Sequence, residues 1–89
     1  MKSIFKYELP INGISKVIMP EGAKILKISQ QGIGVYIWAL IDTEAFHHEY
    51  RFRIIGTGHP IEEEESSLEF VETFMMNGGQ LVFHVFKMR

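Results

Sequence analysis

The chain has 89 residues, of which 46% are hydrophobic and 22% are charged, so it suits one folded domain and is too apolar for a disordered protein. Nine basic and eleven acidic residues give a formal net charge of −2, which argues against a polybasic nucleic-acid binder, and we expect no direct nucleic-acid binding. The absence of cysteine excludes disulfides, cysteine-bound zinc and thiol catalysis.

The N-terminal segment predicts a strand followed by a tight turn. In residues 4–11, apolar side chains alternate with Lys6, Glu8 and Pro10, which is typical of a half-buried strand. Pro10 cannot donate a ladder hydrogen bond, so this strand should lie at a sheet edge or end there. Asn12-Gly13 is a strong hairpin signal because both residues tolerate positive φ, which makes residues 14–19 the predicted return strand.

The middle of the chain predicts three more strands. Residues 24–30 form a third strand, and two glycines in the loop 31–34 lead into residues 35–41. The segment 35–41 is apolar on both faces, which predicts a central strand that is covered on both sides. The polar residues 43–49 are predicted to be the loop of a long hairpin, and residues 50–54 its alternating return strand.

The C-terminal part carries an acidic run and a predicted hairpin. Glu62 to Glu65 repel one another, which predicts a solvated loop or one exposed helical turn. Residues 68–76 fit either a strand or a helix, and we favour the strand because the turn Asn77-Gly78-Gly79 separates them from residues 80–86, which have a strand pattern.

These elements predict a single all-β domain, residues 1–89. About seven short strands with little or no helix favour a small antiparallel β-sandwich or barrel. Because strands 35–41 and 81–86 are apolar on both faces, we also predict a homo-oligomer. No apolar run approaches the ~18–20 residues that cross a bilayer. The first ten residues lack a signal-peptide core, so we expect a cytoplasmic protein with no membrane contact.

The segment after the 50–54 strand is the predicted ligand-binding site. Alternate glycines can turn backbone N–H groups the same way and form an anion-binding concavity, to which a hydroxyl, an imidazole and two guanidinium groups could add donors. The predicted ligand-binding residues are Arg51, Arg53, Gly56, Thr57, Gly58 and His59. The alternative is a simple bend at the strand exit, and the lysine and helix of a P-loop are missing.

Other candidate groups support weaker functional readings. His47 and His48 are adjacent, so on an extended chain they point to opposite faces, and we predict no metal site and no cofactor. No catalytic residue is identified. The aromatic residues Tyr36, Trp38, Phe83 and Phe86 could stack on bases, but they are assigned to the core because the net charge is negative and few lysines flank them. The predicted partner-binding surface consists of Glu62, Glu63, Glu64 and Glu65.

Several strings of the sequence together resemble a family of small uncharacterised proteins encoded by phages, prophages and bacterial genomes. The strings are KYELPI (6–11), GAKIL (22–26), WALID (38–42), FRIIGTGHPI (52–61) and GGQLVFHVF (78–86). The resemblance covers nearly the whole chain and implies expression in a bacterial cytoplasm, often from a mobile element. The family offers no activity to carry over.

The expected function is therefore that of a non-enzymatic phage or prophage accessory protein. It would act against host machinery or defence, either by binding a host protein or by sequestering a small anionic, nucleotide-like ligand. One alternative is a small nucleotide-processing enzyme that uses His59 as acid or base. Another is a minor virion or assembly component, in which exposed sheet edges provide the contacts.

Overall fold

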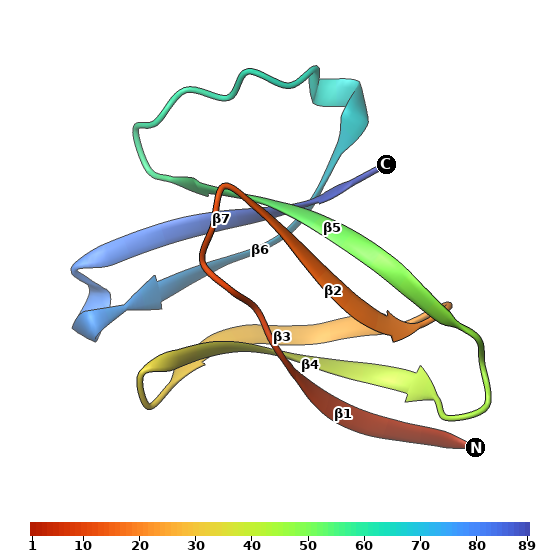
Figure 1. Cartoon of the computed structure of the whole chain (residues 1–89). Coiled ribbons are helices and arrows are strands. Elements are labelled where there is room, and N and C mark those ends of the chain that lie inside the picture. The colour runs from red at the N-terminus through yellow and green to blue at the C-terminus, as the bar shows by residue number, and fades with distance from the viewer.

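The structure, a computed structural model, describes every residue from Met1 to Arg89 and contains seven strands and no α-helix (Figure 1). The strands are β1 (Lys2–Glu8), β2 (Ile14–Pro20), β3 (Lys24–Gln31), β4 (Gly34–Asp42), β5 (His47–Gly56), β6 (Leu68–Met76) and β7 (Leu81–Met88). Two single-turn 3₁₀ helices, η1 (Glu65–Ser67) and η2 (Asn77–Gly79), complete the fold. No helix is long and apolar enough to cross a membrane. The predicted all-β class with about seven strands is confirmed.

The strands form two antiparallel sheets that lie one over the other (Figure 1). One sheet has the order β1-β4-β3 and the other has the order β2-β5-β7-β6, so the fold is a sandwich and not a barrel. As predicted, β1 lies at an edge and β4 is central in its sheet.

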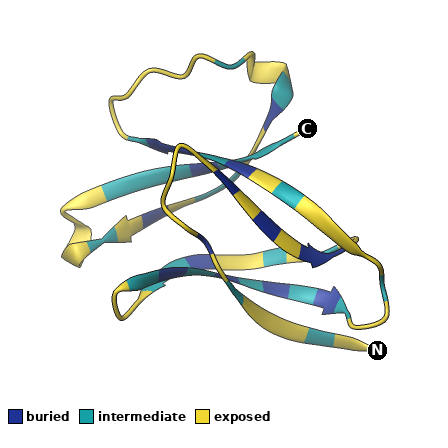
Figure 2. Ribbon diagram, viewed as in Figure 1, coloured by how far each residue is buried: buried dark blue, intermediate teal, exposed yellow.

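The core lies between the sheets and follows the two-residue period of the strands (Figure 2). Along β4, every second side chain from Val35 to Ile41 is buried, and Ile37 has no exposed surface. Phe52 and Val85 close the core from the opposite sheet, also without exposed surface. The other face of β4 carries Tyr36, Trp38 and Leu40, which are only half-buried, so the prediction that this strand is covered on both sides is wrong.

Two predicted hairpins are wrong, because each of the two connections passes from one sheet to the other. β1 pairs with β4 and β2 pairs with β5, so Asn12-Gly13 joins the layers instead of closing a hairpin. The Ser15 hydroxyl donates to the carbonyl of Pro10 and stabilises this crossing. Likewise, the predicted hairpin loop 43–49 is a short turn followed by the start of β5 at His47.

The predicted strand 68–76 and the turn after it are confirmed. β6 pairs with β7, and the turn between them has positive φ at Asn77 (52°), Gly78 (68°) and Gly79 (92°). Glu72 interrupts the apolar alternation of this strand, and the pairing register shifts at this point, between Phe70 and Glu72. Because of this bulge, the Glu72 carboxylate reaches β3 and accepts a hydrogen bond from the backbone N–H of Ile28.

Candidate functional site

The segment Gly56 to His59 leaves the end of β5 and uses part of its backbone for hydrogen bonds within the protein. The N–H of Thr57 donates to the carbonyl of Val82 (3.2 Å), and the N–H of His59 donates to the carbonyl of Gly56 (3.1 Å). Gly58 has φ +88°, which favours glycine. Two of the amides that would form an anion cradle are therefore already engaged, and these contacts match the bend alternative.

Two threonines hold the imidazole of His84 beside this bend. The Thr57 hydroxyl lies 2.7 Å from Nε2 and the Thr73 hydroxyl lies 2.9 Å from Nδ1. In a neutral imidazole one nitrogen donates and the other accepts, and a hydroxyl can satisfy either. His59 lines the same shallow hollow of about 210 Å³, and its ring lies so close to Gly56 that a Cβ there would be 3.2 Å from Nδ1. The geometry therefore gives both histidines close structural contacts.

Arg53 ties the segment between β5 and β6, residues 57–67, to the four-stranded sheet, and we call this segment the covering loop. Its Nε lies 2.8 Å from a carboxylate oxygen of Glu63, and the two side chains are only 20% and 23% exposed. Its Nη1 donates to the carbonyls of Gly13 (3.0 Å) and Ile54 (3.2 Å). A hydrogen bond from its own backbone N–H, and then the one from Arg53, hold the pKa of the Glu63 carboxyl below its ordinary value. Arg53 is thus occupied, and Glu63 is drawn away from the acidic surface.

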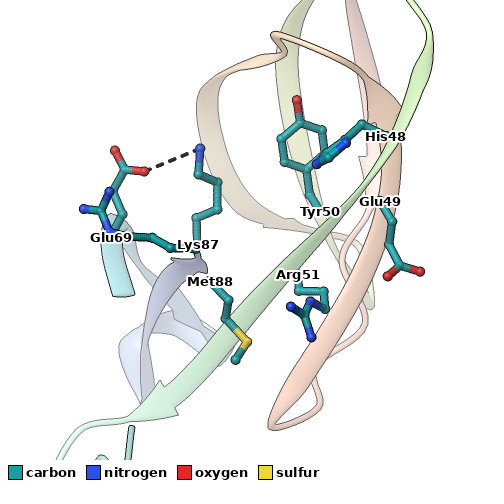
Figure 3. Close-up of a pocket in the computed structure, with 8 residues that line it drawn as sticks. His48, Glu49, Tyr50, Arg51, Glu69, Lys87 and Met88 are labelled. Atoms are coloured by element: carbon teal, nitrogen blue, oxygen red, sulfur yellow. Dashed lines mark ion pairs between the residues drawn. The ribbon is translucent and has the colours of Figure 1, made fainter. Parts of the chain in front are cut away.

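Arg51 lies elsewhere, in an open hollow at the free edge of β5 (Figure 3). Pairing between β5 and β7 begins only at Phe52 and Lys87, so the first half of β5 has no partner on that side. The hollow has a volume of about 530 Å³. We call it the Arg51 hollow, and its lining residues are His48, Glu49, Tyr50, Arg51, Glu69, Lys87, Met88 and Arg89.

The Arg51 hollow combines free positive charge with an ordered aromatic pair. Lys87 pairs with Glu69 at 3.4 Å, whereas Arg51 and Arg89 form no ion pair with any carboxylate. The Tyr50 hydroxyl accepts from the N–H of Gly22 (3.1 Å) and donates to the carbonyl of Pro20 (3.3 Å), which holds its ring. The His48 ring meets Tyr50 edge-on, with centroids 4.8 Å apart.

Of the predicted site residues, the structure brings Gly56, Thr57, Gly58 and His59 together, and it separates them from Arg51. Sequence reasoning missed Lys87 and Arg89, because the end of β7 becomes a neighbour of β5 only through the strand order. It also missed Tyr50, because this residue is considered only as part of the alternating pattern of its strand. No group of three potential metal ligands is present, and His47 and His48 lie in β5 instead of a loop.

Comparison with known proteins places the chain in a family. No match was found among curated proteins or among solved structures. Residues 1–89 match the family model described as a domain of unknown function, DUF7352. Because the match covers the whole chain, the protein belongs to this uncharacterised DUF7352 family.

Proposed function

We propose that the protein is a non-enzymatic binding protein that holds a small anionic, nucleotide-like ligand in the Arg51 hollow. The observation that carries this proposal is the unpaired guanidinium of Arg51 in a hollow that the fixed side chain of Tyr50, on the other face of β5, also lines. The volume of about 530 Å³ falls within the usual range for small-molecule sites.

Each wall of the hollow suits one part of a nucleotide. A guanidinium can donate two parallel hydrogen bonds to phosphate oxygens, which makes Arg51 and Arg89 the candidate phosphate ligands. The face of an aromatic ring suits a base, and Tyr50 is the ordered aromatic residue here. The Glu49 carboxylate can accept hydrogen bonds from sugar hydroxyls.

The proposed biological role is sequestration by a phage or prophage accessory protein. The resemblance to mobile-element proteins supports a setting in which a host signal or defence nucleotide is the ligand. A sequestering protein binds this ligand and releases it unchanged. The alternative, a nucleotide-processing enzyme that uses His59, would release a converted product.

A thermal-shift screen against mono-, di- and cyclic nucleotides and nucleotide sugars tests the proposal. At about 100 times its Kd, a ligand that binds only the folded state stabilises it by about 2.7 kcal/mol. For a domain of this size that is on the order of 10–20 °C in Tm. We expect Arg51→Ala to abolish the shift and Lys16→Ala to retain it, because Lys16 pairs across from Arg51 but does not line the hollow.

Three results would count against the proposal. The first is the absence of a shift with any class of ligand, and the second is a shift that survives in Arg51→Ala. The third is chromatography of the recovered ligand that shows conversion, which would favour the enzyme. Arg51→Lys tests whether the guanidinium geometry matters. It keeps the positive charge but loses the two parallel donors of the guanidinium, so it should bind the ligand more weakly than the wild type.

A protein partner is the second candidate, favoured by the exposed acidic residues of the covering loop. Glu62, Glu64 and Glu65 are exposed and form no ion pair, so they are available to a basic surface. Pull-down from host lysate should recover one protein, and reversal of these three charges to lysine should abolish the recovery. Glu63 stays unchanged in this variant because it pairs with Arg53.

Self-association remains part of the proposal. β2 is an edge strand, and Ile14 and Ile18 on its outer face are 48% and 53% exposed. An apolar edge of this kind favours strand pairing between copies. Light scattering after size exclusion should show more than one protomer, and Ile18→Lys should shift the mass to the monomer.

A further inference from the structure

We propose that the outer face of the three-stranded sheet binds single-stranded nucleic acid. We call this surface the Trp38 face. It consists of every second side chain of β1 and β4, together with the matching ones of β3: Lys2, Ile4, Lys6, Glu8, Lys24, Leu26, Lys27, Ser29, Tyr36, Trp38, Leu40 and Asp42. It lies on the three-stranded sheet, whereas the Arg51 hollow lies on the four-stranded sheet.

The strand register surrounds the aromatic side chains with lysines. Trp38 pairs across from Lys6 on β1 and from Lys27 on β3, so it has a lysine on each side. The Lys6 Nζ lies 4.7 Å from the centroid of the Tyr36 ring and donates to Gln31 at 2.9 Å. The rings of Tyr36 and Trp38 lie 6.2 Å apart at an angle of 64°. Aromatic faces next to cations suit stacked bases that are linked by phosphates.

The surface above Trp38 is hollowed and open to solvent. This second hollow has a volume of about 470 Å³ and lies between Ile4 of β1 and Leu26 of β3. Both of these side chains are exposed, by 57% and 48%. A register shift between Ile25 and Lys27 adds Leu26 to the strand. Ile4 and Leu26 form apolar walls on either side of the Trp38 indole, so the hollow has room for an unpaired base.

Charge complementarity selects a polyanion as the occupant. The Trp38 face carries four lysines, none of which forms an ion pair, and two carboxylates. Asp42 pairs with the Met1 amino group at 3.2 Å, so Glu8 is the one unpaired acid and the face keeps an excess of positive charge. The overall charge of −2 hides an asymmetry, because residues 1–43 hold five lysines and three acidic residues, and the rest of the chain holds four cations and eight acidic residues. A two-fold dimer through this face would set lysines against lysines, which disfavours a second copy as the occupant.

Single-stranded rather than duplex nucleic acid fits this surface, because the bases of a duplex are already stacked and paired. The sequence prediction of no nucleic-acid binding rests on the net charge of −2 and on the few lysines that flank Trp38 along the chain. The pairing of β1 and β3 with β4 supplies lysines from distant positions. The prediction that Tyr36 and Trp38 belong to the core is wrong, since both are half-exposed on this outer face.

The test uses Trp38, the only tryptophan of the chain, as its own reporter. A thymidine oligonucleotide of about 12 nucleotides, within the usual site size for such surfaces, is titrated while tryptophan fluorescence is recorded. We expect saturable quenching that weakens with salt. The double variant Lys6→Gln/Lys27→Gln should lower the affinity at least tenfold and flatten the salt slope by about 0.7 for each lysine removed. Lys16→Gln on β2 is the matched control and should behave as the wild type.

Labelled-oligonucleotide anisotropy provides the second measurement, since it does not depend on the tryptophan. In this assay Trp38→Leu should lose affinity at least tenfold, whereas Trp38→Phe should keep most of it. Circular dichroism verifies that each variant is folded. Arg51→Ala should bind the oligonucleotide as the wild type does, so this inference and the proposed function fail separately.

The inference is overturned by any of four results. The first two are the absence of tryptophan quenching by the oligonucleotide and an affinity of Trp38→Leu that equals that of the wild type. The other two are an equal loss of affinity in Lys16→Gln and in the double lysine variant, and a duplex that binds as tightly as the single strand. A protein that dimerises through this face without nucleic acid, seen as loss of dimer in Trp38→Leu, would also overturn it.

Discussion

The hydrogen bond from the Ile28 N–H to the Glu72 carboxylate is predicted to be a main polar link between the two sheets. It joins β6, an edge strand of one sheet, to β3, an edge strand of the other. Without the carboxylate, a backbone N–H that is half shielded from water would lose its acceptor. Hydrogen bonds to charged groups contribute about 1.5–3 kcal/mol. Because Glu72 is only half-buried, water can replace part of this contribution, and we expect Glu72→Ala to cost about 1.5–2 kcal/mol.

A loss of this size is measurable in two ways. For a domain of this length it lowers Tm by about 6–15 °C, which circular dichroism detects, and it lowers the urea midpoint without changing the m value. Glu72→Gln keeps an acceptor but removes the charge, so it should lose less than Glu72→Ala. Glu62→Ala is the control, because this exposed side chain forms no ion pair, and it should stay within about 0.5 kcal/mol of the wild type.

Hydrogen exchange at the Ile28 amide makes the prediction specific. In the wild type this amide should be protected, and in Glu72→Ala its exchange should rise more than that of other β3 amides. If Glu72→Ala were as stable as Glu62→Ala, or if the Ile28 amide kept its protection, the link between the sheets would have to come from apolar packing alone.

Two further substitutions test the loop and the core. The pKa of Glu63 is lowered in the folded protein, so its contribution to stability is fully present above the ordinary pKa of glutamate. This contribution is lost as the pH falls through the lowered pKa. The stabilities of the wild type and Glu63→Gln should therefore differ at neutral pH and converge in acid. Ile37 has no exposed surface, so Ile37→Ala should cost about 2–5 kcal/mol in urea denaturation and Ile37→Val only about 0.5–1.5 kcal/mol. Equal losses for both Ile37 variants, or parallel acid curves for Glu63→Gln, would contradict these expectations.

The strands could be predicted because their signals are local. The β-branched and aromatic content of residues 35–41, which predicts a strand there, and the turn at Asn77 to Gly79 depend only on neighbouring residues, and both are confirmed. The pairing of β6 with β7 follows from that turn, but the pairing between strands that are distant along the chain could not be predicted this way. Asn12-Gly13 has the chemistry of a hairpin, but the edge of β1 is already satisfied by β4, and Leu9 N–H continues that pairing by donating to Val35.

Whether a charged side chain is paired or free also depends on residues that are distant along the chain. Arg51 and Arg53 lie on one face of β5 by their spacing, and the sequence treats them alike. The covering loop brings Glu63 to Arg53, while the end of β7 leaves Arg51 open. Composition alone could not show that Arg53 is paired and Arg51 is free. The difference depends on the path of the covering loop, which brings Glu63 next to Arg53.

Gly34 offers a way to test whether the orientation of Tyr36 matters on the Trp38 face. A Cβ at Gly34 would lie 2.8 Å from the Tyr36 hydroxyl, so Gly34→Ala must displace the ring, while the backbone there does not require positive φ. The matched control is Gly32→Ala, where φ is +63° and no atom lies within 4 Å of the added Cβ. This control strains the backbone by about 1–2 kcal/mol without touching Tyr36. We therefore expect Gly34→Ala to weaken oligonucleotide binding with little loss of stability. Gly32→Ala should lose stability but keep its affinity for the oligonucleotide. If Gly34→Ala bound as tightly as the wild type, the position of Tyr36 would not contribute to nucleic-acid binding.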